Sequence, residues 1–218
     1  KGGMGEYVVD VKFRDMKRRM SFIKEKLDEA KKKRELYQLQ RAKSGMPVFS
    51  LVGYTSSGKT TLFNVLAKEQ KETSSSLFTT LSTTTRLLHL ADREALLTDT
   101  VGFISRLPTY MVDAFKSTLE ESLSADLVLL LIDASEDLQD IRIKYTACWQ
   151  VLDELKVDRS KVLIVFTKYD RLGSEDIVER IAQDLGIPPP LAISKTGYNL
   201  HKLKTLLSQH SKHARTDS

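Results

Sequence analysis

The stretch GYTSSGKT, from Gly53 to Thr60, follows an apolar run and fits the pattern G-x-x-x-x-G-K-[ST]. Glycine at the two fixed positions lets backbone N–H groups approach phosphate oxygens without a side chain in the way. Lys59 would neutralise charge on the β and γ phosphates, and the Thr60 hydroxyl would bind Mg²⁺. The pattern therefore predicts a phosphate site made of Gly53, Tyr54, Thr55, Ser56, Ser57, Gly58, Lys59, Thr60 and Thr61.

A second motif, DTVG, comes at the end of the apolar run EALLT. Asp99 would hold Mg²⁺ through water, and the Gly102 N–H would contact the γ phosphate. The stretch before it, residues 71–90, is rich in Ser and Thr, which is typical of a switch loop ordered by the γ phosphate and Mg²⁺. We expect Thr80 to bind the metal, with Thr79 second and residues 83–86 weaker candidates. The expected metal ligands are Thr60, Thr80 and Asp99, and the expected catalytic groups are Lys59, Gly102 and Thr80.

A third motif, TKYD, follows the apolar run KVLIVF. Asp170 would accept hydrogen bonds from N1–H and the amine of guanine; adenine offers neither, so a buried Asp170 would be left unpaired. Lys168 would lie along the base, and Thr167 stands where asparagine is usual, with a hydroxyl that can still bond to the phosphate loop. In AISK, backbone N–H groups at Ser194 and Lys195 would bind guanine O6. These residues favour a guanine site over a generic P-loop ATPase.

The elements that must position these motifs begin after Pro47, where apolar runs alternate with amphipathic helical patterns. VFSLVG, ADLVLLLIDAS, KVLIVFTK and PLAIS predict buried strands, and LLHLADREALLTDT predicts two strands around a turn at Asp92. Strands of this kind need both faces covered. We therefore expect an α/β P-loop NTPase fold of the Ras-like type, a mostly parallel six-stranded sheet with helices on both faces. It would span residues 47–211, followed by a tail over 212–218.

Residues 1–46 differ from the rest in charge and pattern. They hold 14 Lys and Arg against 7 Asp and Glu, whereas residues 47–218 hold 20 against 22. From Phe13 to Lys43 there is no Pro or Gly, and apolar residues recur at helical spacing, which predicts a helical arm that ends at SGMP. Two interpretations stay open: a solvated linker helix packed on the next domain, or a basic arm that contacts RNA.

Composition limits the other possibilities. With 41% hydrophobic and 29% charged residues and no uninterrupted apolar run of about eighteen, the chain reads as a globular protein without a membrane span. Its one cysteine, Cys148, excludes an internal disulfide and is expected to be a buried structural thiol, consistent with a reducing, cytoplasmic setting. The four histidines have no metal-ligand spacing. We expect a monomer.

Four stretches, GYTSSGKTTLFNVL, LFTTLSTTTR, DTVGFISRLPTYMVDAFKSTLEES and ADLVLLLIDAS, together resemble the HflX family of ribosome-associated P-loop GTPases. The resemblance covers the chain from Pro47 to the last helix, and GGMGEYVVDVKFRDMKRRMSFIKEKL resembles the end of that family's N-terminal domain with its helical linker. Most of that glycine-rich N-terminal domain is absent. The resemblance implies a GTPase that binds the large ribosomal subunit and its RNA, is stimulated by it, and acts in ribosome splitting or recycling. Thr167 and the Ile193–Ser194 pair depart from the family pattern.

Phe103 follows the DTVG motif, where many GTPases carry the glutamine that orients the attacking water. Phenylalanine has no group that can hydrogen-bond a water, so we expect slow intrinsic hydrolysis that a partner accelerates; a hydrophobic plug under ISRLP is an equally good interpretation of this residue. The alternative function is a nucleotide-dependent RNA-binding or ribosome-assembly module with incidental turnover, which the basic arm favours.

Overall fold

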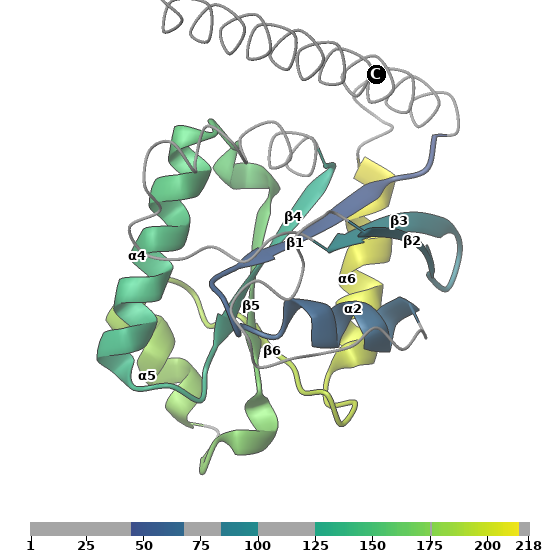
Figure 1. The fold of residues 1–218 in the computed structure, drawn as a ribbon. Coiled ribbons are helices and arrows are strands. Elements are labelled where there is room, and N and C mark those ends of the chain that lie inside the picture. Colours follow the sequence, from purple (N-terminus) through teal and green to yellow (C-terminus); the bar gives the residue numbers. More distant parts are fainter. Residues whose placement is uncertain (1–44, 68–83, 100–124, 175, 214–218) are drawn as a thin grey trace, which may run out of the picture. The chain divides into compact units, whose positions relative to one another are not determined.

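The computed structural model describes residues 45–67, 84–99, 125–174 and 176–213. A division between Gly45 and Met46 separates two units, and the second contains every element described here. The strands are β1 (Val48–Gly53), β2 (Thr84–His89), β3 (Glu94–Asp99), β4 (Leu127–Asp133), β5 (Val162–Thr167) and β6 (Leu191–Ala192) (Figure 1). The helices are α2 (Lys59–Ala67), α4 (Leu138–Glu154), α5 (Asp176–Leu185) and α6 (Leu200–His213), with short 3-10 turns η1 (Arg159–Lys161) and η2 (Tyr169–Arg171).

The six strands form one sheet in the order β2-β3-β1-β4-β5-β6. All neighbouring pairs are parallel except β2 and β3, which form an antiparallel hairpin. Its turn is closed by a 2.9 Å hydrogen bond from the Leu90 N–H to the Arg93 carbonyl, so Asp92 lies in the turn as expected. β4 is buried at all seven positions because it lies at the centre of the sheet with parallel neighbours on both sides.

Helices cover both faces of the sheet (Figure 1). On one face, strand residues such as Val52 and Leu130 pack with Ile141 and Leu152 of α4 and Ile181 of α5. On the other face, a second cluster joins the alternate strand residues to α2 and α6; it includes Phe49, Leu51, Leu129, Phe63 and Leu203. The alternation follows from the period of two along a strand. The expected α/β P-loop fold, with its mostly parallel six-stranded sheet, is thus confirmed.

Some expectations fall outside the described residues or shift at their edges. The helical arm expected over residues 13–43 lies outside them. The last helix continues to His213, two residues past the boundary placed at 211. In the part of the chain that the structure describes, we find no helix with the length and hydropathy needed to cross a membrane.

Candidate nucleotide site

Four parallel strands end at one edge of the sheet with residues suited to binding. β1 ends at Gly53, β3 at Asp99, β4 at Asp133 and β5 at Thr167. Their pairing registers place these ends side by side, since Leu51 pairs with Asp99 and Asp133 with Thr167. In open α/β sheets, ligands bind outside the carboxyl ends of the strands. The motifs identified from the sequence therefore converge on one edge.

The loop from Gly53 to Gly58 turns the chain from β1 into α2 without room for a side chain at its start. Gly53 has φ +149°, and a Cβ there would lie 2.5 Å from the Leu131 carbonyl oxygen and 2.7 Å from Ser57 Oγ. Gly58 has φ +93° and Ser56 φ +64°, so three residues of this short loop are in backbone conformations that side chains disfavour. Such a loop exposes N–H groups at a helix N-terminus, which is a site for an anion.

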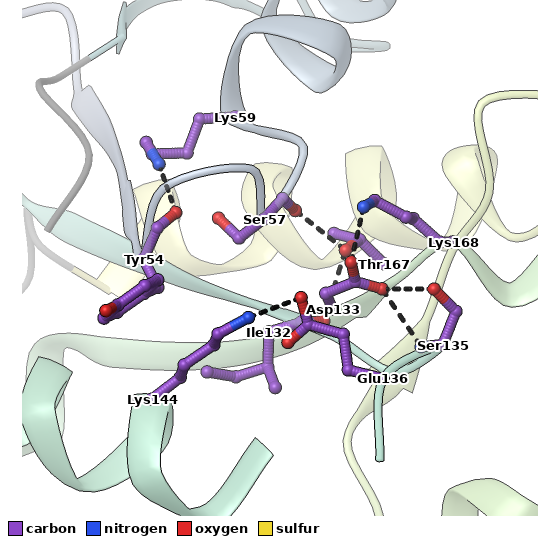
Figure 2. A network of polar contacts seen from close by, with 10 residues as sticks. All are labelled: Tyr54, Ser57, Lys59, Ile132, Asp133, Ser135, Glu136, Lys144, Thr167 and Lys168. Atoms are coloured by element: carbon purple, nitrogen blue, oxygen red, sulfur yellow. Dashed lines mark hydrogen bonds and ion pairs between the residues drawn. The ribbon is translucent and has the colours of Figure 1, made fainter. Parts of the chain in front are cut away.

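Lys59 is buried at the first position of α2, with 6% of its surface exposed. Its ammonium donates to the Gly53 carbonyl at 3.0 Å. It also donates to the Tyr54 carbonyl at 2.7 Å (Figure 2). Burial lowers the pKa of Lys59 to about 8, and the nearby Asp99 carboxylate opposes this shift. A cation held at this depth is poised for a ligand with negative charge, since such a ligand would stabilise its charged form.

Thr60 and Asp99 bring two oxygen donors together from α2 and β3. The Thr60 hydroxyl donates to Asp99 Oδ2 at 3.0 Å, and Asp99 is fully buried. Mg²⁺ prefers hydroxyl and carboxylate oxygens, which it binds directly or through water. The pair therefore fits a magnesium site by donor type. The other expected groups, Thr80, its alternate Thr79, and Gly102, lie outside the described residues.

Three of the four weaker switch candidates, residues 84–86, are part of β2, and residue 83 lies outside the described residues. Thr84 pairs with Asp99 across the hairpin, and the Thr85 hydroxyl lies 3.1 Å from that of Thr98. Thr84 therefore lies next to Asp99, the candidate metal ligand, whereas the Thr85 hydroxyl is hydrogen-bonded within the hairpin.

The loop after β5 is tied to the phosphate loop through Thr167. Its hydroxyl lies 2.8 Å from the Ser57 carbonyl and 3.2 Å from the Ile132 carbonyl, and can donate its one proton to either (Figure 2). Threonine thus makes the link to the phosphate loop that the sequence analysis attributed to asparagine.

Lys168 follows in the left-handed conformation, with φ +58°, and its ammonium forms an ion pair with Asp133 (Figure 2). Asp133 is buried and also accepts from the Ser135 backbone N–H (3.0 Å) and hydroxyl (2.7 Å). This fixes the direction of the Lys168 side chain. Sequence reasoning missed Asp133, although its place at the end of the run LVLLLID is the same signal that identified Asp99.

A cleft of about 590 Å³, counted to its open mouth, lies between the phosphate loop, α2 and the loops after β5 and β6. All five residues expected near the base contribute to its wall. The cleft is lined by Gly58, Thr61, Leu62, Val65, Thr167, Lys168, Asp170, Arg171, Ile193, Ser194, Lys195 and Leu200. Ser194 is buried, whereas Asp170 and Lys195 are exposed. Burial of Asp170, on which the choice between guanine and adenine was argued, would therefore have to come from a base seated in the cleft.

Helix α4 supports the phosphate loop from the side away from the cleft. Lys144 lies 5.3 Å from the centroid of the Tyr54 ring and pairs with Glu136 at 2.5 Å (Figure 2). One α4 turn further on, Cys148 is fully buried, and burial raises the pKa of its thiol to about 12. The expected structural thiol is confirmed, and it belongs to the packing beneath the loop.

The comparisons with known proteins agree with this geometry. The model of the 50S ribosome-binding GTPase family matches residues 48–168. GTPase HflX of Thermococcus kodakarensis is 42% identical over 179 residues, which are 82% of this chain and 40% of that protein. GTPase HflX of Methanocaldococcus jannaschii is 38% identical over 213 residues, 96% of this chain and 52% of that protein. The chain thus spans about half or less of these relatives' length.

Solved structures extend the likeness to three dimensions. A GTP-binding protein from Sulfolobus solfataricus, solved in complex with GDP, has a TM-score of 0.61 and 27% identity, covering 98% of this chain and 68% of its own. Aquifex aeolicus Era bound to GDP·AlF4⁻ has a TM-score of 0.60 and 22% identity over 76% of this chain and 56% of its own, and it supports the fold alone. The chain belongs to the 50S ribosome-binding GTPase family, and its resemblance to the HflX GTPases is confirmed.

Proposed function

We propose that the chain binds guanine nucleotides at the edge of the sheet and hydrolyses GTP as a switch. One observation carries this proposal: the phosphate loop reaches the cleft of the Asp170 loop through Gly58 and Thr61. The Thr60–Asp99 pair lies at the same turn into α2. Each motif is common in isolation, but their convergence supplies a phosphate cradle, two metal ligands and a base pocket in the order that a nucleotide requires.

In this proposal the phosphates lie over the loop from Gly53 to Gly58. Its backbone N–H groups and the helix N-terminus bind phosphate oxygens, and Lys59 approaches the β and γ phosphates. Because the pKa of Lys59 is lowered only to about 8, the side chain is mostly protonated at pH 7 and meets the phosphates as a cation. These groups also stabilise the charge that develops on the transferred phosphoryl group.

Mg²⁺ is the proposed cofactor. Thr60 and Asp99 would hold it, with Thr80 as the expected third protein ligand. When bound, it neutralises charge shared between the β and γ phosphates. The N–H of Gly102, three residues after Asp99, would contact the γ phosphate.

The base is read from the cleft opposite the phosphates. Asp170 accepts from N1–H and the exocyclic amine of guanine, the stem of Lys168 lies along the ring, and N–H groups at Ser194 and Lys195 bind O6. Adenine would leave the Asp170 carboxylate covered but without donors, and this is the physical basis of discrimination.

We further propose that intrinsic hydrolysis is slow and that the large ribosomal subunit accelerates it. Phe103, which lies outside the described residues, offers no hydrogen bond to an attacking water, so a partner must order or supply that group. The resemblance to the HflX GTPases supports the large subunit and its RNA as this partner, and the surplus of basic residues over 1–46 supports contact with a polyanion. We place the protein in the cytoplasm as a monomer, and propose a part in ribosome splitting or recycling.

The basic region favours a second candidate, in which the chain is a nucleotide-dependent RNA-binding or assembly module and turnover is incidental. Filter binding of ribosomal RNA with and without GTP separates it from the switch. In the module, RNA affinity depends on nucleotide while turnover is unchanged by ribosomes.

The deciding experiment measures phosphate release from GTP, and from ATP as control, with and without purified large ribosomal subunits. Lys59→Met is assayed beside the wild type, because GTPases carried over with the subunits give the same background in both. We expect stimulation with GTP only, and only in the wild type. Unchanged slow GTP turnover removes the partner from the proposal, and equal use of ATP contradicts the guanine site.

A further inference from the structure

Two tyrosine rings stack face to face beside the base cleft. The Tyr169 and Tyr198 ring centroids are 4.2 Å apart and the planes differ by 4°. Tyr169 is half-buried and packs against the buried cluster under α4 and α5, which includes Phe166 and Ile181. Tyr198 is 42% exposed and lies on the outer side of Tyr169. One ring is therefore anchored in the core, and the other is held by it.

The stack joins the two loops that carry the base-reading groups. Tyr169 lies between Lys168 and Asp170, and Tyr198 comes four residues after Ser194. Neither ring lines the base cleft, whereas Asp170, Ser194 and Lys195 do. The contact therefore acts on the cleft from outside, by fixing one loop against the other.

Hydrogen bonds shape the second loop so that Tyr198 meets its partner. The Ser194 N–H donates to the Tyr198 carbonyl (3.3 Å), and the Asn199 side-chain amide donates to the Ala192 carbonyl (3.0 Å). Gly197 (φ +108°) and Asn199 (φ +56°) take the left-handed conformations that this tight loop needs. Between the loops, the Tyr169 N–H donates to the Ile193 carbonyl at 3.1 Å. This backbone bond holds the start of the second loop, at Ile193. The stack adds a second link at the far end of the same loop, at Tyr198.

We propose that Tyr198 is a positioning residue of the base site, which stacks on Tyr169 to hold the loop over residues 194–198 in the shape that receives guanine. This inference rests on the proposed function of the cleft. A loop that is already held in place does not have to be ordered when the nucleotide binds. The nucleotide therefore binds with higher affinity and dissociates more slowly. The contact uses the ring and not the hydroxyl, so phenylalanine should replace tyrosine here.

The test uses Tyr198→Ala, Tyr198→Phe and Ile143→Ala in the full chain. Ile143, on α4, is 51% exposed and serves as the matched control for loss of an exposed apolar side chain. The probe is GDP with a fluorescent group on the ribose. We expect Tyr198→Ala to release it about three- to tenfold faster, the range given by one aromatic pair. Tyr198→Phe should stay within about twofold of the wild type, and Ile143→Ala should not change.

Inorganic tripolyphosphate separates positioning from a general loss of structure. It engages the phosphate loop without a base, so its affinity should be the same in Tyr198→Ala and the wild type if the tyrosine acts on the base loops alone. An equal loss of both ligands would overturn the inference, as would failure of phenylalanine to restore slow release or unchanged release in Tyr198→Ala. If the wild type binds no GDP at all, it is the proposed function that fails, and the two outcomes are distinct.

Discussion

The phosphate side and the base side of the site are built in different ways. The phosphate side is a continuous stretch from Gly53 to Thr60, shaped by its own backbone and by one buried cation. The base side is assembled from loops that are far apart in the sequence and are joined by side chains, through Thr167, the Lys168–Asp133 pair and the Tyr169–Tyr198 stack. Asp170, the residue proposed to recognise the base, is exposed, whereas Lys59 on the phosphate side is buried.

This difference predicts how the two sides tolerate change. On the phosphate side, function depends on a few groups held at fixed depth, so single substitutions should have large effects. On the base side, several modest contacts share the work of holding the loops, so each should have a smaller effect. Substitutions on the two sides therefore test the comparison directly.

The largest effect is expected for Lys59→Met. The substitution keeps the aliphatic stem but removes the charge that faces the phosphates, and we expect GTP turnover to fall at least about 100-fold. The protein without nucleotide should be as stable as the wild type or more so at pH 7, because the variant no longer holds a buried charge whose pKa is lowered to about 8. Single-turnover kinetics and thermal unfolding measure the two outcomes. A lowered unfolding temperature would show that Lys59 is needed for the fold itself.

Asp170→Asn should change which base is preferred. An asparagine amide donates where the carboxylate accepts, so it opposes the amine of guanine and matches the carbonyl at the same position of xanthine. We expect about 100-fold weaker binding of GDP and a gain for xanthosine diphosphate. Competition titrations with GDP and xanthosine diphosphate measure the two affinities and so the change in preference. Binding of tripolyphosphate serves as control and should not change, because the phosphate side is intact.

Nucleotide affinity should depend on pH through Lys59. Its pKa is lowered to about 8 in the free protein, and a bound phosphate favours the charged form, so binding takes up a proton above pH 8. Affinity should be nearly constant below that value and fall about tenfold between pH 7 and 9. The arginine in Lys59→Arg stays charged over this whole pH range. This variant therefore separates the titration of Lys59 from that of the guanine base. Equal slopes in the two proteins would assign the fall to another group.

The sequence predicted the phosphate side better than the base side for a physical reason. The Gly53–Thr60 motif is local, and its glycines and lysine are required by phosphate chemistry whatever surrounds them. The mostly parallel sheet and its two covered faces also followed from continuous apolar runs such as LVLLLID. By contrast, Asp133 and Tyr198 gain their roles only when β4, β5 and β6 bring separate loops together, and no spacing in the sequence contains that information. Asp170 lines the cleft, but its exposure depends on the open cleft and was not predicted.

The smallest effect expected here is that of Thr167→Val, which tests whether one hydroxyl couples the two sides. Valine keeps the shape but leaves the Ser57 carbonyl without the 2.8 Å bond, a loss of about 1 kcal/mol, or about fivefold in affinity if the bond is intact when nucleotide is bound. Thr167→Ser retains the hydroxyl and should restore binding. The informative measurement is the ratio of losses for GDP and for tripolyphosphate. Because Thr167 contacts the phosphate loop while leading into the base loop, both ligands should weaken, unlike in Asp170→Asn. A loss confined to GDP would mean that the hydroxyl serves the base loop alone, and that the two sides are held independently.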